Sequence, residues 1–167
     1  MLLVCACSLV ACASIDTSRM IPDTSLGPNR QIALSVRVAE VAGGKQGSFG
    51  TAQMVDNADI LAAVVATLHK ARIFTGVSTS QGDIDLFVSV LAQDQKDVSI
   101  MHYTARMLVV YKFVAKDGST LWSETYDSSF SSTAFAGSTR TLQAREGAVR
   151  ENLAALIQGI KERWPSK

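Results

Sequence analysis

Four stretches of the chain alternate between apolar and polar residues. A period of two places every second side chain on the same face of a β-sheet, so each stretch predicts a half-buried strand. The predicted strands lie at residues 32–39, 83–92, about 101–113 and 121 to about 130. The second strand also carries Phe87 and Leu91 on its other face, which indicates that both of its sides are covered in part.

Two further stretches repeat apolar residues every three or four positions, which is typical of a helix with one buried face. The first helix begins at a cap, Asp56 or Asn57, and ends near Ile73-Phe74, before Gly76. Pro165 ends the second helix. The apolar stripes consist of Ile60, Leu61, Val64, Val65, Leu68 and Ala71 in the first helix, and of Leu142, Val149, Leu153, Leu156, Ile157, Ile160 and Trp164 in the second.

The order of these elements is β-α-β-β-β-α, with a hairpin turn at Lys116-Asp117-Gly118-Ser119 between the last two strands. We expect an α+β fold over residues 31–167, a two-layer sandwich with two helices on one face of a four-stranded mixed sheet. The first two strands are parallel if they share this sheet, because a helix connects them. The other face of the sheet is then free to dock a partner.

The three cysteines, Cys5, Cys7 and Cys12, all lie at the start of the chain. Residues 1–11 form an apolar run that is typical of a signal peptide. The run ends in Leu9-Val10-Ala11-Cys12, which resembles the lipobox of bacterial lipoproteins. This resemblance implies cleavage before Cys12 and acylation of its thiol and amine. The alternative is a buried N-terminal strand or helix with incidental cysteines.

Acylation would anchor the protein without a membrane-spanning helix, because each buried methylene contributes about 0.8 kcal/mol. Ala13 and Ser14 follow the cysteine where inner-membrane lipoproteins usually carry Asp, so this pair resembles the outer-membrane class. We therefore expect an outer-membrane lipoprotein that faces the periplasm. Residues 12–30 contain two of the three prolines and show no apolar periodicity, which predicts a flexible tether.

Composition narrows the choice of partners. Charged residues make up 19% of the chain and the net charge is +1, so a basic face for nucleic acid is not expected. After residue 12, no apolar run approaches the roughly 20 residues that a membrane-spanning helix needs.

Candidate catalytic and metal sites are weak. His69 and His102 are 33 positions apart and have no His, Cys or carboxylate partner at ligand spacing, so we interpret them as ordinary surface or boundary residues. The segment Gly43–Ser48 is only loosely similar to a phosphate loop, and no G-x-S-x-G motif is present. We expect no cofactor, no metal and no enzymatic activity.

Two further patterns have a functional and a structural interpretation. Asp83 and Asp85 share one strand face, where paired carboxylates could act together, but solvated strand ends explain them more simply. The aromatic residues Trp122, Tyr126 and Phe130 could stack on a ligand, but this spacing in a strand is more typical of a core.

The whole pattern over about residues 55–160 resembles the YajG-like lipoproteins. The features that carry the resemblance are the helix Ile60–Leu68, the strand Ile84–Leu91, the long strand with Tyr103 and Ala105, the Asp117-Gly118 hairpin, and the terminal helix from Leu142. The outline is also similar to auxiliary lipoproteins of envelope ABC transporters and to the lipoprotein partner of the lipopolysaccharide-assembly barrel. The chain departs from this pattern in its glycine-rich loop at 42–50 and in the absence of basic residues from positions 1–11.

The resemblance implies that the chain works by binding partners. We expect a non-catalytic subunit or adaptor of a cell-envelope assembly or transport system, with envelope proteins or further copies of the chain as partners. The alternative is a periplasmic carrier that binds a lipid or glycan between sheet and helices. An apolar cavity of several hundred Å³ would favour the carrier, and a filled core would favour the adaptor.

Overall fold

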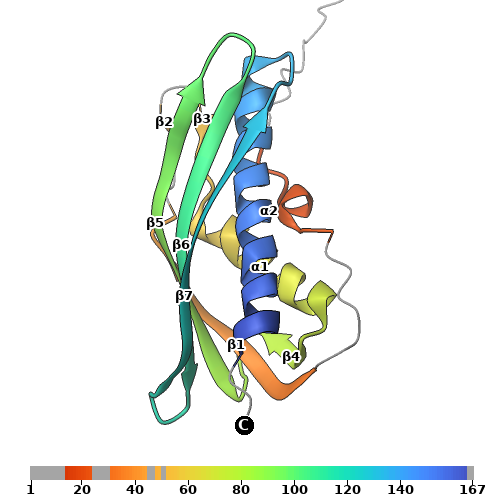
Figure 1. Ribbon diagram of the computed structural model, residues 1–167, viewed down its shortest axis with the longest axis vertical. Helices are drawn as coiled ribbons and strands as arrows, with labels where there is room; N and C mark the ends of the chain where they lie inside the picture. Colours follow the sequence, from red (N-terminus) through yellow and green to blue (C-terminus); the bar gives the residue numbers. More distant parts are fainter. Residues whose placement is uncertain (1–13, 24–30, 45–47, 50–51, 165–167) are drawn as a thin grey trace, which may run out of the picture.

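The computed structural model describes residues 14–23, 31–44, 48–49 and 52–164. A five-stranded mixed sheet with the strand order β4-β1-β5-β6-β7 is covered on one face by two helices (Figure 1). The α+β sandwich is therefore confirmed, but the sheet has five strands and not four. The additional strand is β4 (Phe74–Ser78), which follows the first helix directly.

The first half of the domain is parallel. β1 (Ile32–Ala42) pairs in parallel with β4 on one side and with β5 (Ile84–Val98) on the other, so the expected parallel start is confirmed. Between them, α1 (Asn57–Ala71) begins at Asp56, whose side chain accepts the N–H of Asp59. The helix ends earlier than expected, at Arg72, which adopts a left-handed conformation with φ 49°. After this residue the chain continues into β4.

The second half is an antiparallel meander. β6 (Tyr103–Ala115) pairs with β5 and with β7 (Thr120–Ser132). The turn between β6 and β7 contains Gly118 at φ 85°, a conformation that favours glycine, as the Asp-Gly sequence predicts. A separate two-stranded ribbon consists of β2 (Ser48–Phe49) and β3 (Ala52–Gln53).

The core lies between the sheet and the helices. α2 (Gly137–Arg163) packs against β6 and β7 (Figure 1). Its expected stripe is buried except for Trp164, which follows the helix and is half-buried, and Leu153 and Leu156 are fully inaccessible. α1 buries Ile60, Val64 and Leu68 in the same cluster. None of the helices in the described ranges is long and apolar enough to cross a membrane.

The segment before β1 is partly ordered. η1 (Thr17–Met20) is a short 3-10 helix that packs on the helices on the side away from the sheet (Figure 1), and Met20 is fully buried there. Residues 14–23 lie within the tether predicted over residues 12–30, and in the structure this part packs on the domain. Residues 1–13, Cys12 among them, and residues 24–30 lie outside the described ranges.

Candidate functional site

The face of the sheet opposite the helices, here called the outer face, carries an apolar centre on β5 and β6. Phe87, Leu108 and Val110 lie half-buried there, outside the hydrophobic core. Leu91, on the same face, has 59% of its surface exposed. The sequence pattern had indicated Phe87 and Leu91 as a second apolar face of their strand. In the structure Phe87 pairs with Lys112, two residues from Val110 on β6, and Leu91 lies at a register shift next to the pair Ala92 and Leu108.

A β-bulge lies at Leu91. The register between β5 and β6 shifts between Val90 and Ala92, so the next inward-facing side chain is Gln93 and not another apolar residue. The buried Gln93 amide donates to the carbonyl of Val55 (2.8 Å) and accepts from the N–H of Val55 (3.2 Å). The bulge thus fixes one end of the apolar centre to the segment before α1.

An ion-pair set lies at one end of the apolar centre. Arg37 of β1 donates two hydrogen bonds of 2.8 Å to Asp85 of β5, and Lys116 donates a third of 2.9 Å. The hydrogen bonds from Arg37 hold the pKa of Asp85 below its usual value. Asp83 does not pair with Asp85, because its carboxylate accepts from the backbone N–H and hydroxyl of Ser35. The two aspartates therefore do not form a catalytic carboxylate pair.

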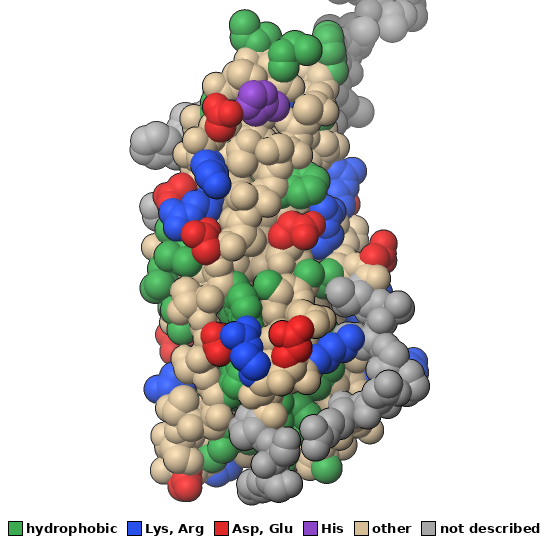
Figure 2. Space-filling model, in the orientation of Figure 1, with side chains coloured by type: hydrophobic (Ala, Val, Ile, Leu, Met, Phe, Trp, Pro, Cys, Tyr) green, Lys and Arg blue, Asp and Glu red, His purple; other side chains and the backbone are tan. Residues whose placement is uncertain are grey.

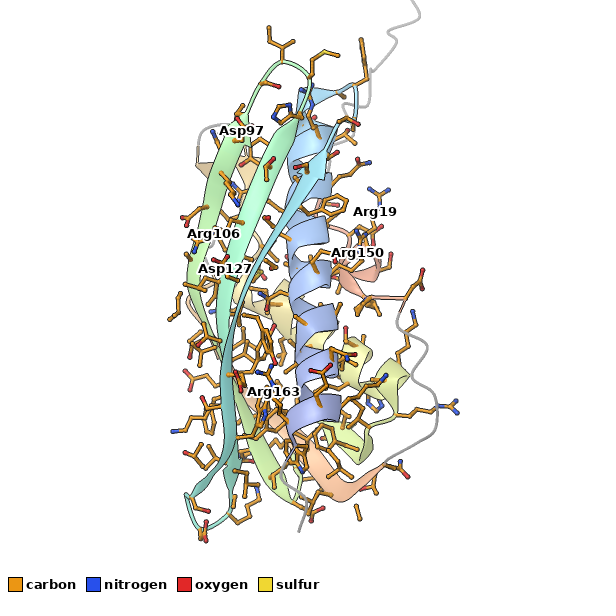
Figure 3. All side chains as sticks on the ribbon, viewed as in Figure 1. Arg19, Asp97, Arg106, Asp127, Arg150 and Arg163 are labelled. Carbon is orange, nitrogen blue, oxygen red and sulfur yellow. The ribbon has the colours of Figure 1, made fainter. Side chains whose placement is uncertain are left out.

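A second ion-pair set lies at the other end of the apolar centre. Arg106 of β6 binds Asp127 of β7 through two hydrogen bonds of 2.8 and 2.7 Å, and it reaches Asp94 of β5 at 3.4 Å (Figure 3 labels Arg106 and Asp127). The bond from Arg106 lowers the pKa of Asp127. The first set has two cations and one carboxylate, and the second has one cation and two carboxylates. Charged groups of this kind suit the polar rim of a protein interface.

The aromatic residues of β7 lie on the inner face, against α2. Trp122 is buried and packs edge-on against Phe113 at 5.6 Å between ring centroids. Tyr126 and Phe130 are half-buried against the core. The interpretation of this stripe as core is confirmed.

The two histidines have different environments. His69 is exposed in the last turn of α1. His102, in the turn between β5 and β6, contacts Ser99 Oγ through Nδ1 (2.8 Å) and Asp97 through Nε2 (2.7 Å). The sequence analysis found no partner for His102 at metal-ligand spacing and did not predict these two contacts. Asp97 lies near the end of β5, and Ser99 and His102 lie in the turn that follows it, so the contacts follow from hairpin geometry.

The Ser99-His102-Asp97 arrangement is better explained by turn stabilisation than by catalysis. Ser99 Oγ accepts the backbone N–H groups of Met101 and His102, which occupy the lone pairs that a nucleophile would use. Asp97 remains 62% exposed at its side chain. Across the described ranges, no group of three or more His, Cys, Asp or Glu side chains is arranged to hold a metal ion.

Buried polar residues of α2, which the sequence pattern did not reveal, fix the helix in place. Asn152 accepts from the hydroxyl of Tyr111 (2.8 Å) and donates to the carbonyl of Tyr126 (3.0 Å). Glu146, with 2% of its side chain exposed, accepts the N–H of Asp16 (2.7 Å). Glu146 therefore links the N-terminal segment to the domain. Burial raises its pKa.

Comparisons with known proteins identify the fold. No protein-family model matches the chain, and no curated protein matches its sequence. Among solved structures, the chain is similar to protein XCC0632 of Xanthomonas campestris, from family DUF330, with a TM-score of 0.63 and 16% identity over 81% of this chain and 88% of that one.

Two weaker similarities are to lipoprotein GNA1162 of Neisseria meningitidis and to PelC of Paraburkholderia phytofirmans. GNA1162 has a TM-score of 0.47 with 13% identity, covering 77% of this chain and 99% of that one. The PelC dodecamer has a TM-score of 0.48 with 14% identity, covering 79% and 92%. Scores at this level assign no function, and the resemblance to YajG-like lipoproteins is not confirmed. The chain thus shares the fold of the Xanthomonas DUF330 protein.

Proposed function

We propose that this chain is a non-catalytic subunit or adaptor of a bacterial cell-envelope assembly or transport system. Acyl chains on Cys12 hold it on the periplasmic side of the outer membrane. The observation that carries the adaptor role is the outer face, where the exposed Leu91 and three half-buried apolar residues lie between two fixed ion-pair sets. Apolar patches rimmed by polar residues mark interaction sites.

The carrier alternative finds less support. The space between sheet and helices is filled by the packed core. Two surface hollows of about 530 and 680 Å³ lie beside η1, outside that layer. The first is lined by several charged side chains, among them Arg19, Lys70 and Arg150. A lipid carrier needs a mainly apolar enclosure, so these hollows favour the adaptor.

Site-specific photo-crosslinking in cells tests the docking face. A photoreactive amino acid at position 91 of the full-length chain should give one discrete adduct. The same residue at Ser119, which is exposed in the β6–β7 turn, should give none. An adduct with the mass of two copies of this chain would identify the partner as a further copy. Equal labelling from both positions would contradict a role for the outer face.

Substitutions then separate docking from catalysis. Leu91→Glu should abolish co-purification of the partner that crosslinking identifies, because an interface centre tolerates charge poorly. The circular dichroism spectrum should stay unchanged. Ser119→Glu is the matched control and should retain recovery. His102→Ala should keep the cellular phenotype of the wild type. A null phenotype for a folded, membrane-bound His102→Ala protein would contradict the non-catalytic proposal.

A further inference from the structure

Large apolar side chains are exposed together at one end of the molecule. Ile100 and Met101 in the β5–β6 turn are 91% and 75% exposed, and Phe135 in the loop between β7 and α2 is 102% exposed. We call these three residues the apolar tip. Hydrophobic side chains gather at the upper end of the molecule in Figure 2, where Figure 1 places these two loops. Single exposed apolar residues are common, but three that cluster on adjoining loops indicate a contact surface.

One side chain joins the two loops. The guanidinium of Arg140, in the first turn of α2, donates to the carbonyls of Ser99 and Ile100 in one loop. It also donates to the carbonyls of Ala134 (2.8 Å) and Phe135 (3.2 Å) in the other. The apolar side chains are therefore held on a fixed support, and little conformational entropy is lost when they bind.

These hydrogen bonds also suit an apolar environment. Backbone carbonyls without partners are costly where water is excluded. Arg140 satisfies four carbonyls of the two loops, and Ser99 Oγ accepts the N–H groups of Met101 and His102. The tip can thus enter an apolar medium while these carbonyl and N–H groups keep their hydrogen bonds.

The described part of the N-terminal segment begins near the same end. Ser14 lines one surface hollow together with Thr139 and Leu142, in the first turns of α2, just after Phe135. Cys12 precedes Ser14 by two residues, which span at most about 7 Å. The opposite turn, Lys116–Ser119, is polar and lies one strand length away, about 40 Å for the 13 residues of β6.

We propose that the apolar tip inserts into the lipid surface beside the acylated Cys12 and sets the orientation of the domain on the membrane. This inference rests on the proposed lipid anchor. With the tip in the bilayer surface, the long axis of the sheet stands away from the membrane. The outer face then projects into the periplasm, where a protein partner can reach it.

Labels at single added cysteines test this orientation in the processed chain, because Cys5 and Cys7 leave with the signal peptide, Cys12 is acylated and no cysteine follows it. Met101→Cys, Phe135→Cys and, as a control, Ser119→Cys each receive an environment-sensitive fluorophore. The purified proteins are placed in phosphatidylethanolamine–phosphatidylglycerol vesicles with or without brominated acyl chains. We expect a blue shift and loss of most emission to brominated lipid at positions 101 and 135, and no change at 119. All three positions are exposed, so the substitutions should leave the protein folded.

Mass spectrometry of the same samples separates the two proposals. If Cys12 is acylated but the tip labels respond like the label at 119, the tip inference is overturned and the lipoprotein stands. If tip labels quench one another and ignore brominated lipid, the tip binds a second copy, which also overturns it. If Cys12 carries no acyl chain, the proposed anchor fails and the inference fails with it.

Discussion

At the scale of single residues, the two faces of the sheet give leucine different roles. Leu153 of α2 is fully inaccessible in the core, whereas Leu91 of the outer face is 59% exposed. Burial decides how much of a side chain's transfer free energy contributes to folding. The same residue type therefore serves stability in one place and recognition in the other.

Leu153→Ala should lower the free energy of unfolding by about 2–5 kcal/mol, because it leaves a cavity in the core. Leu91→Ala, the matched control, should change it by no more than about 0.5 kcal/mol. Urea denaturation of the soluble domain from residue 14 measures both. A loss below about 1 kcal/mol for Leu153→Ala would contradict the packing of α2 on the sheet.

The buried carboxyl group of Glu146 should make the folding stability depend on pH, and the sign of this effect can be worked out. Burial raises its folded pKa above the unfolded value of about 4.3, so the folded state binds its proton more tightly. Its contribution to stability is complete below the unfolded pKa and is lost as the pH rises through the folded pKa. Glu146→Gln keeps an oxygen that accepts from the N–H of Asp16 and removes the buried charge.

The stability of Glu146→Gln relative to the wild type should therefore increase as the pH rises through that window. Thermal melts of both proteins from acidic to neutral pH measure this difference in stability. Asp85 and Asp127 have opposite effects on the pH dependence, but they are present in both proteins, so their effects cancel in the difference. A difference that stays constant with pH would show that Glu146 is not buried by the N-terminal segment.

At the scale of elements, periodicity found both helices and four of the five main strands. It missed β4 because five residues are too short to show alternation, and because the predicted helix extended to Ile73-Phe74, where the strand begins. It missed η1 because only Met20 of that segment is buried, and one residue has no period. The bulge at Leu91 and the turn that joins His102 to Asp97 depend on pairing between strands, which a single sequence does not show.

α2 approaches β7 closely at Gly147. A Cβ built at Gly147 would lie 2.2 Å from the ring of Phe130, which Arg150 covers at 4.9 Å. Gly147→Ala should therefore destabilise the protein, because overpacking of about 1–3 kcal/mol outweighs the gain of up to about 1 kcal/mol from helix propensity. Gly137→Ala, where a Cβ meets nothing within 4 Å, is the control and should cost no stability. Equal melting temperatures for the two variants would contradict the close contact.

At the scale of the whole molecule, the layered arrangement follows from the sequence, and the arrangement of its surfaces does not. Two amphipathic helices and alternating strands specify which faces are buried. The position of the apolar tip depends on loops that come together only in the fold. In the proposed arrangement the tip and the anchor lie at one end of the molecule, and the outer face is left free for a partner.

The most direct test of the proposed function is the fate of the chain when its anchor is removed. Cells that express the wild type or Cys12→Ser are fed a palmitate analogue, and their inner membranes, outer membranes and soluble proteins are then separated. We expect lipid label and outer-membrane fractionation for the wild type, and an unlabelled precursor or soluble periplasmic product for Cys12→Ser. Continued labelling and membrane association of Cys12→Ser would contradict the assignment of Cys12 as the anchor.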